Sequence, residues 1–218
     1  IAAAVKAKVT LIEKHKMGGD CLNTGCVPSK ALIRSARLAR DMKKAEQLGF
    51  KPIDAEVDFA AVMARIQRVI STVEPHDSVE RYTGLGVEVI EGEARITSPW
   101  TVEVNGQRIT TRAIVIATGA GPTVPSIPGI EQVAPLTSDT VWALREQPKR
   151  LLVLGGGPIG CELAQAFQRL GCQVTLVQRN ERLLPREDAD ASELLLSSLR
   201  ADGVDVRLQH KAVRFERV

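Results

Sequence analysis

The sequence is poor in the features that mark several large classes of protein. Aromatic residues make up only 3% of its 218 residues, and 29 basic residues nearly balance 26 acidic ones. Without a basic stripe interleaved with aromatic residues, the composition gives no indication of a nucleic-acid-binding surface. No apolar run approaches the roughly 18 residues needed to cross a membrane. We therefore expect a soluble, cytoplasmic chain that contacts neither nucleic acid nor membrane.

Cysteine and histidine are also scarce, with four and three residues respectively. Zinc sites need clusters of these residues, and the histidines are scattered, so no metal-binding residues are predicted. Cys21 and Cys26 are the exception, because they lie close together in the sequence. One close cysteine pair in a chain of this kind favours redox chemistry over a structural disulfide.

The spacing of Cys21 and Cys26 constrains the backbone between them. On an ideal helix, residues five apart have Cα atoms roughly 8.5 Å apart, whereas a disulfide spans no more than roughly 7 Å. The chain must therefore leave helical geometry between the cysteines, and Gly25 permits this. Lys30 follows Cys26 by four positions, which places its ammonium on the same face if a helix resumes. A thiolate at such a helix start is expected to have a lowered pKa.

A glycine-rich motif occupies a typical dinucleotide-binding context. The apolar strand expected over residues 150–154 runs directly into Gly-Gly-Gly-Pro-Ile-Gly and then into a helical pattern. In such a motif the first glycine (Gly155) makes the tight turn, the second (Gly157) lets the backbone approach a pyrophosphate, and the third (Gly160) allows close helix packing. The motif predicts a nicotinamide dinucleotide site.

The end of the following strand, expected over residues 173–177, indicates which nicotinamide is used. Enzymes specific for NADH usually have an acidic residue there, but this chain has Gln178 followed by Arg179. An acid would repel a 2′-phosphate, whereas arginine accommodates it. We therefore expect NADPH rather than NADH.

The start of the chain also reads as part of a dinucleotide-binding unit. Residues 1–5 are expected to end a helix, and residues 9–12 form a strand that closes on Glu13. An acid at that position hydrogen-bonds ribose hydroxyls in βαβ units. Glu13 is thus predicted to bind a nucleotide.

The run from Gly18 to Lys30 resembles the redox-active motif of the pyridine nucleotide-disulfide oxidoreductases, although Asp20 stands where that family more often has threonine. The resemblance implies an α/β fold with two Rossmann-like dinucleotide-binding units, truncated at both ends. An FAD-binding domain without its first strand and glycine turn is expected over residues 1–140. An incomplete NAD(P)-binding domain is expected over residues 141–218. The C-terminal dimerisation domain would be absent, and the full-length parent would be a homodimer.

The resemblance further implies a route for electrons from NAD(P)H through FAD and the Cys21–Cys26 disulfide to a small-molecule or disulfide substrate. Cys26 would lie nearest the flavin, Cys21 would attack the substrate, and Lys30 would pair with Glu162 beneath the flavin ring. The residues implied to bind FAD are Glu13, Gly18, Gly19, Thr118 and Gly119.

Within this family, residues 174–179 look most like mercuric reductase, and a dihydrolipoamide dehydrogenase type of enzyme is the alternative. The chain by itself is expected to be inactive, so a nucleotide-binding module without catalysis also remains open for it.

The remaining pattern predicts conventional elements. Apolar residues at three- and four-residue steps indicate an amphipathic helix from Phe59 to near Pro75. Cys161 and Cys172 flank a predicted helix and are expected to be structural. Further predictions are a helix over 29–48, a strand over 87–90, a hairpin (100–104 and 108–110) turning at Asn105-Gly106, a buried apolar strand over 113–117, a helix over 192–199 and a strand over 204–208.

Overall fold

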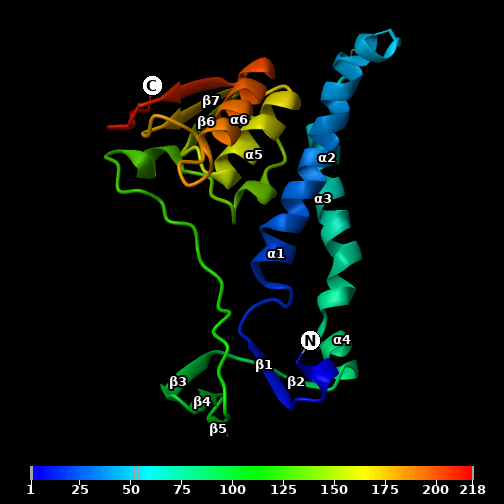
Figure 1. Ribbon diagram of the computed structural model, residues 1–218, viewed down its shortest axis with the longest axis vertical. Coiled ribbons are helices and arrows are strands. Elements are labelled where there is room, and N and C mark those ends of the chain that lie inside the picture. Colours follow the sequence, from blue (N-terminus) through cyan, green and yellow to red (C-terminus); the bar gives the residue numbers. More distant parts are fainter. Residues whose placement is uncertain (1, 52, 54, 218) are drawn as a thin grey trace.

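The computed structural model describes residues 2–51, 53 and 55–217, and its fold is α/β. Two long antiparallel helices run side by side along one side of the molecule, with one sheet near their lower end and another beside them (Figure 1). The N-terminal elements are η1 (Ala3–Val5), β1 (Val9–Glu13), α1 (Gly19–Asn23), α2 (Cys26–Lys43), η2 (Ala45–Leu48), α3 (Phe59–Val73), η3 (Glu74–Asp77), α4 (Val79–Gly84) and β2 (Val87–Glu91).

Both long helices were predicted. Helix α3 follows the predicted periodicity, whereas α2 begins three residues earlier than predicted and ends at Lys43, with the 3₁₀ turn η2 completing the predicted range. Helix α3 begins where the Asp58 carboxylate accepts a hydrogen bond of 2.8 Å from the Ala61 amide, which caps its first turn. Helix α2 begins at Cys26 and carries Pro28 in its first turn, where a missing N–H costs nothing. The expected helix over residues 1–5 is only a short 3₁₀ turn, and residue 1 lies outside the described residues.

Strands β1 and β2 pair in parallel, with Val9 opposite Val87 and Glu13 opposite Glu91. A separate antiparallel sheet follows, made of β3 (Ala94–Ser98), β4 (Thr101–Val104) and β5 (Gln107–Thr110). Asn105 and Gly106 both have positive φ, at 50° and 76°, as a tight hairpin turn requires. The predicted hairpin is therefore confirmed, whereas β3 was not predicted.

The predicted buried strand over residues 113–117 is wrong. This segment belongs to a long irregular connection, and Val115 and Ile116 are 87% and 71% exposed. An apolar run becomes a buried strand only if another strand offers it hydrogen bonds. Among the described residues, 113–117 pairs with no strand, and the sheet of β1 and β2 keeps only those two strands.

The C-terminal elements form a parallel sheet in the order β6-β7-β8. Two short 3₁₀ helices, η4 (Ile130–Val133) and η5 (Val141–Ala143), lead into it. The elements are β6 (Arg150–Leu154), α5 (Pro158–Arg169), β7 (Gln173–Gln178), α6 (Ala189–Ala201) and β8 (Asp205–Leu208). Each corresponds to a predicted element, with α5 and α6 starting three residues earlier than expected.

The hydrophobic core crosses from the long helices into this second sheet. Leu32 and Ala36 of α2 belong to the same buried cluster as Ala164 of α5. The rings of Phe59 and Phe167 lie 6.1 Å apart between centroids. No helix among the described residues is long and apolar enough to cross a membrane.

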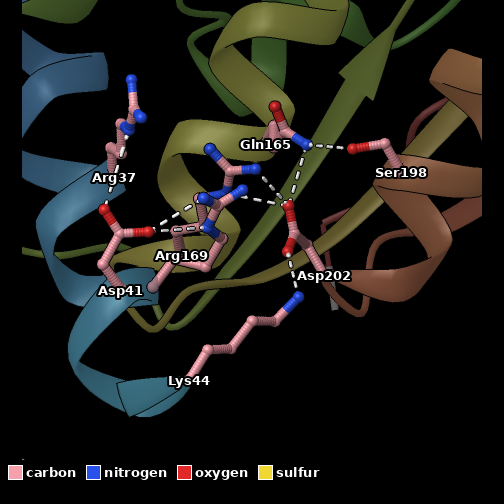
Figure 2. A network of polar contacts seen from close by, with 8 residues as sticks. Arg37, Asp41, Lys44, Gln165, Arg169, Ser198 and Asp202 are labelled. Carbon is pink, nitrogen blue, oxygen red and sulfur yellow. Dashed lines mark hydrogen bonds and ion pairs between the residues drawn. The ribbon is translucent and has the colours of Figure 1, made fainter. Parts of the chain in front are cut away.

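A polar network lies beside this core (Figure 2). The Asp202 carboxylate follows α6 and accepts hydrogen bonds of 2.8 Å from both Arg169 and Gln165 of α5. Lys44, which follows α2, lies 3.9 Å from the same carboxylate. The side chains of Arg169 and Asp202 are only 11% and 5% exposed. The network thus joins three helices through one buried ion pair.

Replacing Asp202 with alanine should lower the free energy of unfolding by about 3 kcal/mol, because Arg169 would keep a buried charge without its main partner. Urea denaturation measures this change. Glu103→Ala is a matched control, since its ion pair with Arg108 is exposed and should contribute less than about 1 kcal/mol. Equal losses in the free energy of unfolding for both variants would show that the buried ion pair of Asp202 contributes no more than an exposed one.

Candidate functional site

The two cysteines are held by a break between helices. Helix α1 ends at Asn23 and α2 starts at Cys26, so the backbone leaves helical geometry between Cys21 and Cys26, as predicted. The Asp20 carbonyl accepts hydrogen bonds from the Thr24 and Gly25 amides at 2.9 and 2.6 Å. A Cβ atom at Gly25 would lie 2.9 Å from that carbonyl oxygen. The turn is therefore too tight for any residue but glycine.

Both cysteines are exposed, free thiols. The pKa of Cys21 is raised, first by a hydrogen bond between its thiol and Cys26, then by partial burial and by charge on Cys26. A smaller contribution comes from the negative charge of Asp77, at the end of η3. The two sulfurs are thus close enough to influence each other's ionisation.

The other two cysteines have a different environment. Cys161 and Cys172 are buried, and burial raises the pKa of Cys161 to about 11. Burial also raises the pKa of Cys172. Such thiols stay protonated and inaccessible near neutral pH, as a structural role requires.

Lys30 and Glu162 are brought together from distant parts of the chain. The Lys30 ammonium donates hydrogen bonds of 2.9 and 2.7 Å to the two carboxylate oxygens of Glu162. Lys30 lies one turn after Cys26 on α2, and Glu162 lies in α5. The contact expected between them is present, while its catalytic role stays a prediction. The negative charge of the Glu162 carboxylate therefore partly offsets the positive charge of the Lys30 ammonium.

The residues predicted to bind FAD lie in two groups. Gly18 and Gly19 begin α1, and the Thr118–Gly119 segment reaches the same place, because the Ala120 amide donates to the Asp20 carboxylate at 3.3 Å. Glu13 lies apart from them at the carboxyl end of β1, where its carboxylate accepts a hydrogen bond from the His15 amide. An acid at a strand end and open space above Gly19 fit a bound nucleotide.

The glycine motif has the expected strand–turn–helix structure. Helix α5 starts at Pro158 with Gly157 at its N-cap. A methyl group on Gly160 would overlap the Gly155 carbonyl oxygen, so the helix approaches the strand as closely as glycine allows. A Cβ atom at Gly157 would meet nothing within 4 Å. This open space at a helix N-terminus fits a pyrophosphate.

Gln178 and Arg179 lie at the end of β7 but face different surroundings. Gln178 is buried, and its amide donates at 3.4 Å to the Arg182 carbonyl. It packs beneath the glycine turn, because a Cβ atom at Gly156 would lie 3.3 Å from its side chain. Arg179 is exposed. Of the two, Arg179 is the side chain accessible to a cofactor.

Sequence reasoning missed three residues around the cysteines. Trp142 of η5 donates a hydrogen bond of 2.9 Å from its indole nitrogen to the Thr24 carbonyl, inside the loop between the cysteines. Asp20 binds both that loop and the segment at Ala120, and Asp77 acts electrostatically on Cys21. Only Asp20 carried a signal in the sequence, as a departure from the family pattern.

The chain belongs to the pyridine nucleotide-disulphide oxidoreductase family, because the sequence model of that family matches residues 1–218. Among its relatives, mercuric reductase from Bacillus cereus is 40% identical over 205 residues, covering 94% of this chain and 32% of that protein. Dihydrolipoyl dehydrogenase from Thermus scotoductus is 36% identical over 219 residues, covering 99% of this chain and 46% of that protein. The chain thus spans less than half the length of these two relatives.

Two solved structures illustrate the similarity in fold. The Cu(II) complex of the HOCl-induced flavoprotein disulfide reductase RclA from Escherichia coli has a TM-score of 0.79 and 30% identity, covering 98% of this chain and 46% of that one. LpdA from Mycobacterium tuberculosis has a TM-score of 0.81 and 28% identity, covering all of this chain and 49% of that one. The fold and the flavoprotein class agree with the α/β architecture described above.

Replacing Cys26 with alanine should make Cys21 react faster with iodoacetamide near neutral pH. Cys26 is the main cause of the raised pKa of Cys21, so its removal lets the Cys21 thiolate form at lower pH. Peptide mass spectrometry across a pH series locates the midpoint of alkylation. The buried Cys161 and Cys172 should remain unmodified in both proteins. An unchanged or higher midpoint for Cys21 would show that Cys26 does not control its ionisation.

Proposed function

We propose that the chain carries the redox centre of an FAD-dependent oxidoreductase that passes electrons from NADPH through the Cys21–Cys26 disulfide to a substrate. The family assignment supports FAD and oxidoreductase chemistry in general terms. The choice of NADPH, the roles of single residues and the substrate are the finer parts of the proposal.

One observation carries the proposal more than any other. The helix that begins with Cys26 and the helix that begins at the glycine turn are joined by the Lys30–Glu162 ion pair. The redox pair and the proposed NADPH turn therefore lie on two elements that pack against each other. A protein that only bound nucleotides would need neither the close cysteine pair nor the lysine beside it.

Bound FAD, which Glu13, Gly18, Gly19, Thr118 and Gly119 would hold, would supply the chemistry that turns a hydride from NADPH into an electron pair for a disulfide. The disulfide gains two electrons and two protons, so that the bond between Cys21 and Cys26 breaks and two thiols form. Cys21 keeps its proton more readily than an ordinary thiol while Cys26 is its neighbour. Lys30 holds a positive charge one turn from Cys26, and Glu162 fixes the position of that charge.

The substrate we propose first is the mercuric ion, because mercuric reductases are the most similar relatives named above, at 40% identity. Two electrons from the dithiol would reduce Hg(II) to Hg(0), while the two thiols lose their protons to solvent and re-form the disulfide. A lipoamide-type disulfide is the second candidate, since dihydrolipoyl dehydrogenases reach 36% identity. Comparing NADPH oxidation with Hg²⁺ and with lipoamide as acceptors distinguishes them.

Anaerobic NADPH should release two thiols per chain in the FAD-loaded protein. The electron pair would be stored in Cys21 and Cys26, which are both accessible to a thiol reagent. Thiol counting before and after addition measures the gain. Cys161→Ser is the matched control and should leave the gain unchanged, whereas Cys21→Ser should abolish it. A constant thiol count in the unaltered protein would rule out the proposed electron route.

NADPH should reduce the flavin faster than NADH does. Arg179→Glu should shift this preference toward NADH by about 10- to 150-fold, since a hydrogen bond to a charged group contributes about 1.5–3 kcal/mol. Stopped-flow flavin reduction with both nicotinamides measures the ratio. Arg150→Glu is the control, because it makes the same charge change at the opposite end of β6 from the glycine turn. Equal or faster reduction by NADH in the unaltered protein would refute the assignment.

A further inference from the structure

Trp142 connects the redox loop to the second half of the chain. Its indole N–H donates a hydrogen bond of 2.9 Å to the carbonyl of Thr24, a residue 118 positions earlier. The side chain is buried in the common core, with 5% of the residue exposed. A buried indole nitrogen normally has a hydrogen-bond partner, and here the partner is a backbone group between the two cysteines.

The hydrogen-bonded carbonyl lies where the redox loop is most constrained. The amides of Thr24 and Gly25 both donate to the Asp20 carbonyl, at 2.9 and 2.6 Å. Any side chain at Gly25 would press against the same oxygen. The orientation of the peptide between Thr24 and Gly25 is therefore set from one side by Asp20 and from the other by Trp142.

We propose that Trp142 is a positioning residue for the redox pair: its indole N–H fixes the Thr24–Gly25 peptide so that the sulfurs of Cys21 and Cys26 stay within bonding reach of each other. The inference rests on the proposed redox function of the two cysteines. If the proposal holds, Trp142, which lies in the predicted NAD(P)-binding domain, helps to set the thiol–disulfide equilibrium of the two cysteines.

The physical consequence is a change in the stability of the disulfide. Closing a disulfide requires the two sulfurs to meet, and a loop that is held closed loses less conformational entropy when the bond forms. Without the indole N–H, the Thr24–Gly25 peptide can rotate and the two thiols spend less time together. The dithiol form is then favoured.

Trp142→Phe removes the N–H while keeping an aromatic ring in the core. The protein is equilibrated with dithiothreitol of varying oxidation state, and its thiols are counted by mass spectrometry. Two electrons and two protons pass from dithiothreitol to the Cys21–Cys26 disulfide, and dithiothreitol becomes its cyclic disulfide. We expect the equilibrium to move about tenfold toward the dithiol. This shift corresponds to a rise of about 30 mV in the midpoint potential of the cysteine pair.

The chain offers a matched control in its other tryptophan. Trp100 lies between β3 and β4, in a sheet separate from the redox loop, and is 59% exposed. Trp100→Phe should leave the equilibrium unchanged. It also leaves Trp142 as the only tryptophan in the chain, so that fluorescence reports on this residue alone.

In the Trp100→Phe protein, reduction of the cysteine pair should raise the emission of Trp142, because the nearby disulfide is then lost as a quencher. The same treatment should have no effect when Cys21 is also replaced with serine. This readout shows whether Trp142 lies beside the redox pair in both oxidation states. The midpoint shift of Trp142→Phe separates positioning from simple packing, because lost packing would alter stability but not the thiol–disulfide equilibrium. The emission of Trp142 also remains informative if Trp142→Phe fails to fold.

An unchanged midpoint in folded Trp142→Phe overturns the proposal, and so does identical Trp142 emission in both oxidation states. The proposed redox function fails separately, if no disulfide between Cys21 and Cys26 forms in the unaltered protein under oxidising conditions. A midpoint shift together with a redox-dependent emission supports the proposal.

Discussion

The packing of α2 against α5 is the contact on which the candidate site depends. Leu32 and Ala36 of one helix and Ala164 of the other are fully buried in a common cluster. Small residues on both sides let the helices approach closely. The Lys30–Glu162 ion pair lies beside this contact, but its side chains are 61% and 41% exposed. A pair so exposed adds little stability, so its geometry is a consequence of the buried packing.

Local backbone chemistry, by contrast, shapes the redox pair itself. Asp20, Thr24 and Gly25 close the turn through their own amides and carbonyl, within six residues of chain. The hydrogen bonds of this turn therefore depend only on residues between the start of α1 and the start of α2. Besides the buried packing of α2, longer-range hydrogen bonds from Trp142, to Glu162 and from the segment at Ala120 join it to the rest of the molecule. The redox centre is thus a local turn whose place in the molecule is set by packing and by hydrogen bonds from distant residues.

Elements whose signals are local could be predicted from the sequence. The period of α3, the Asn105-Gly106 turn and the strand–glycine–helix run into α5 each depend on neighbouring residues alone. The segment over 113–117 could not be predicted, because an apolar run shows that burial is favourable but not that a partner strand is present. The bond from Trp142 to Thr24 could not be predicted either, since it joins residues 118 positions apart that share no pattern.

The two predicted nucleotide-binding regions differ in how firmly their residues are held. The glycine turn before α5 is fixed by bonds to the neighbouring sheet, such as that from the Gly155 amide to the Val177 carbonyl at 2.9 Å. Thr118 and Gly119 belong to an exposed segment anchored to the redox helix by the contact between Ala120 and Asp20. A ligand that binds a preformed site does not spend binding energy on ordering it. The glycine turn proposed to bind the nicotinamide is preorganised in this sense, and the exposed segment proposed to bind the flavin is held by its contact with Asp20.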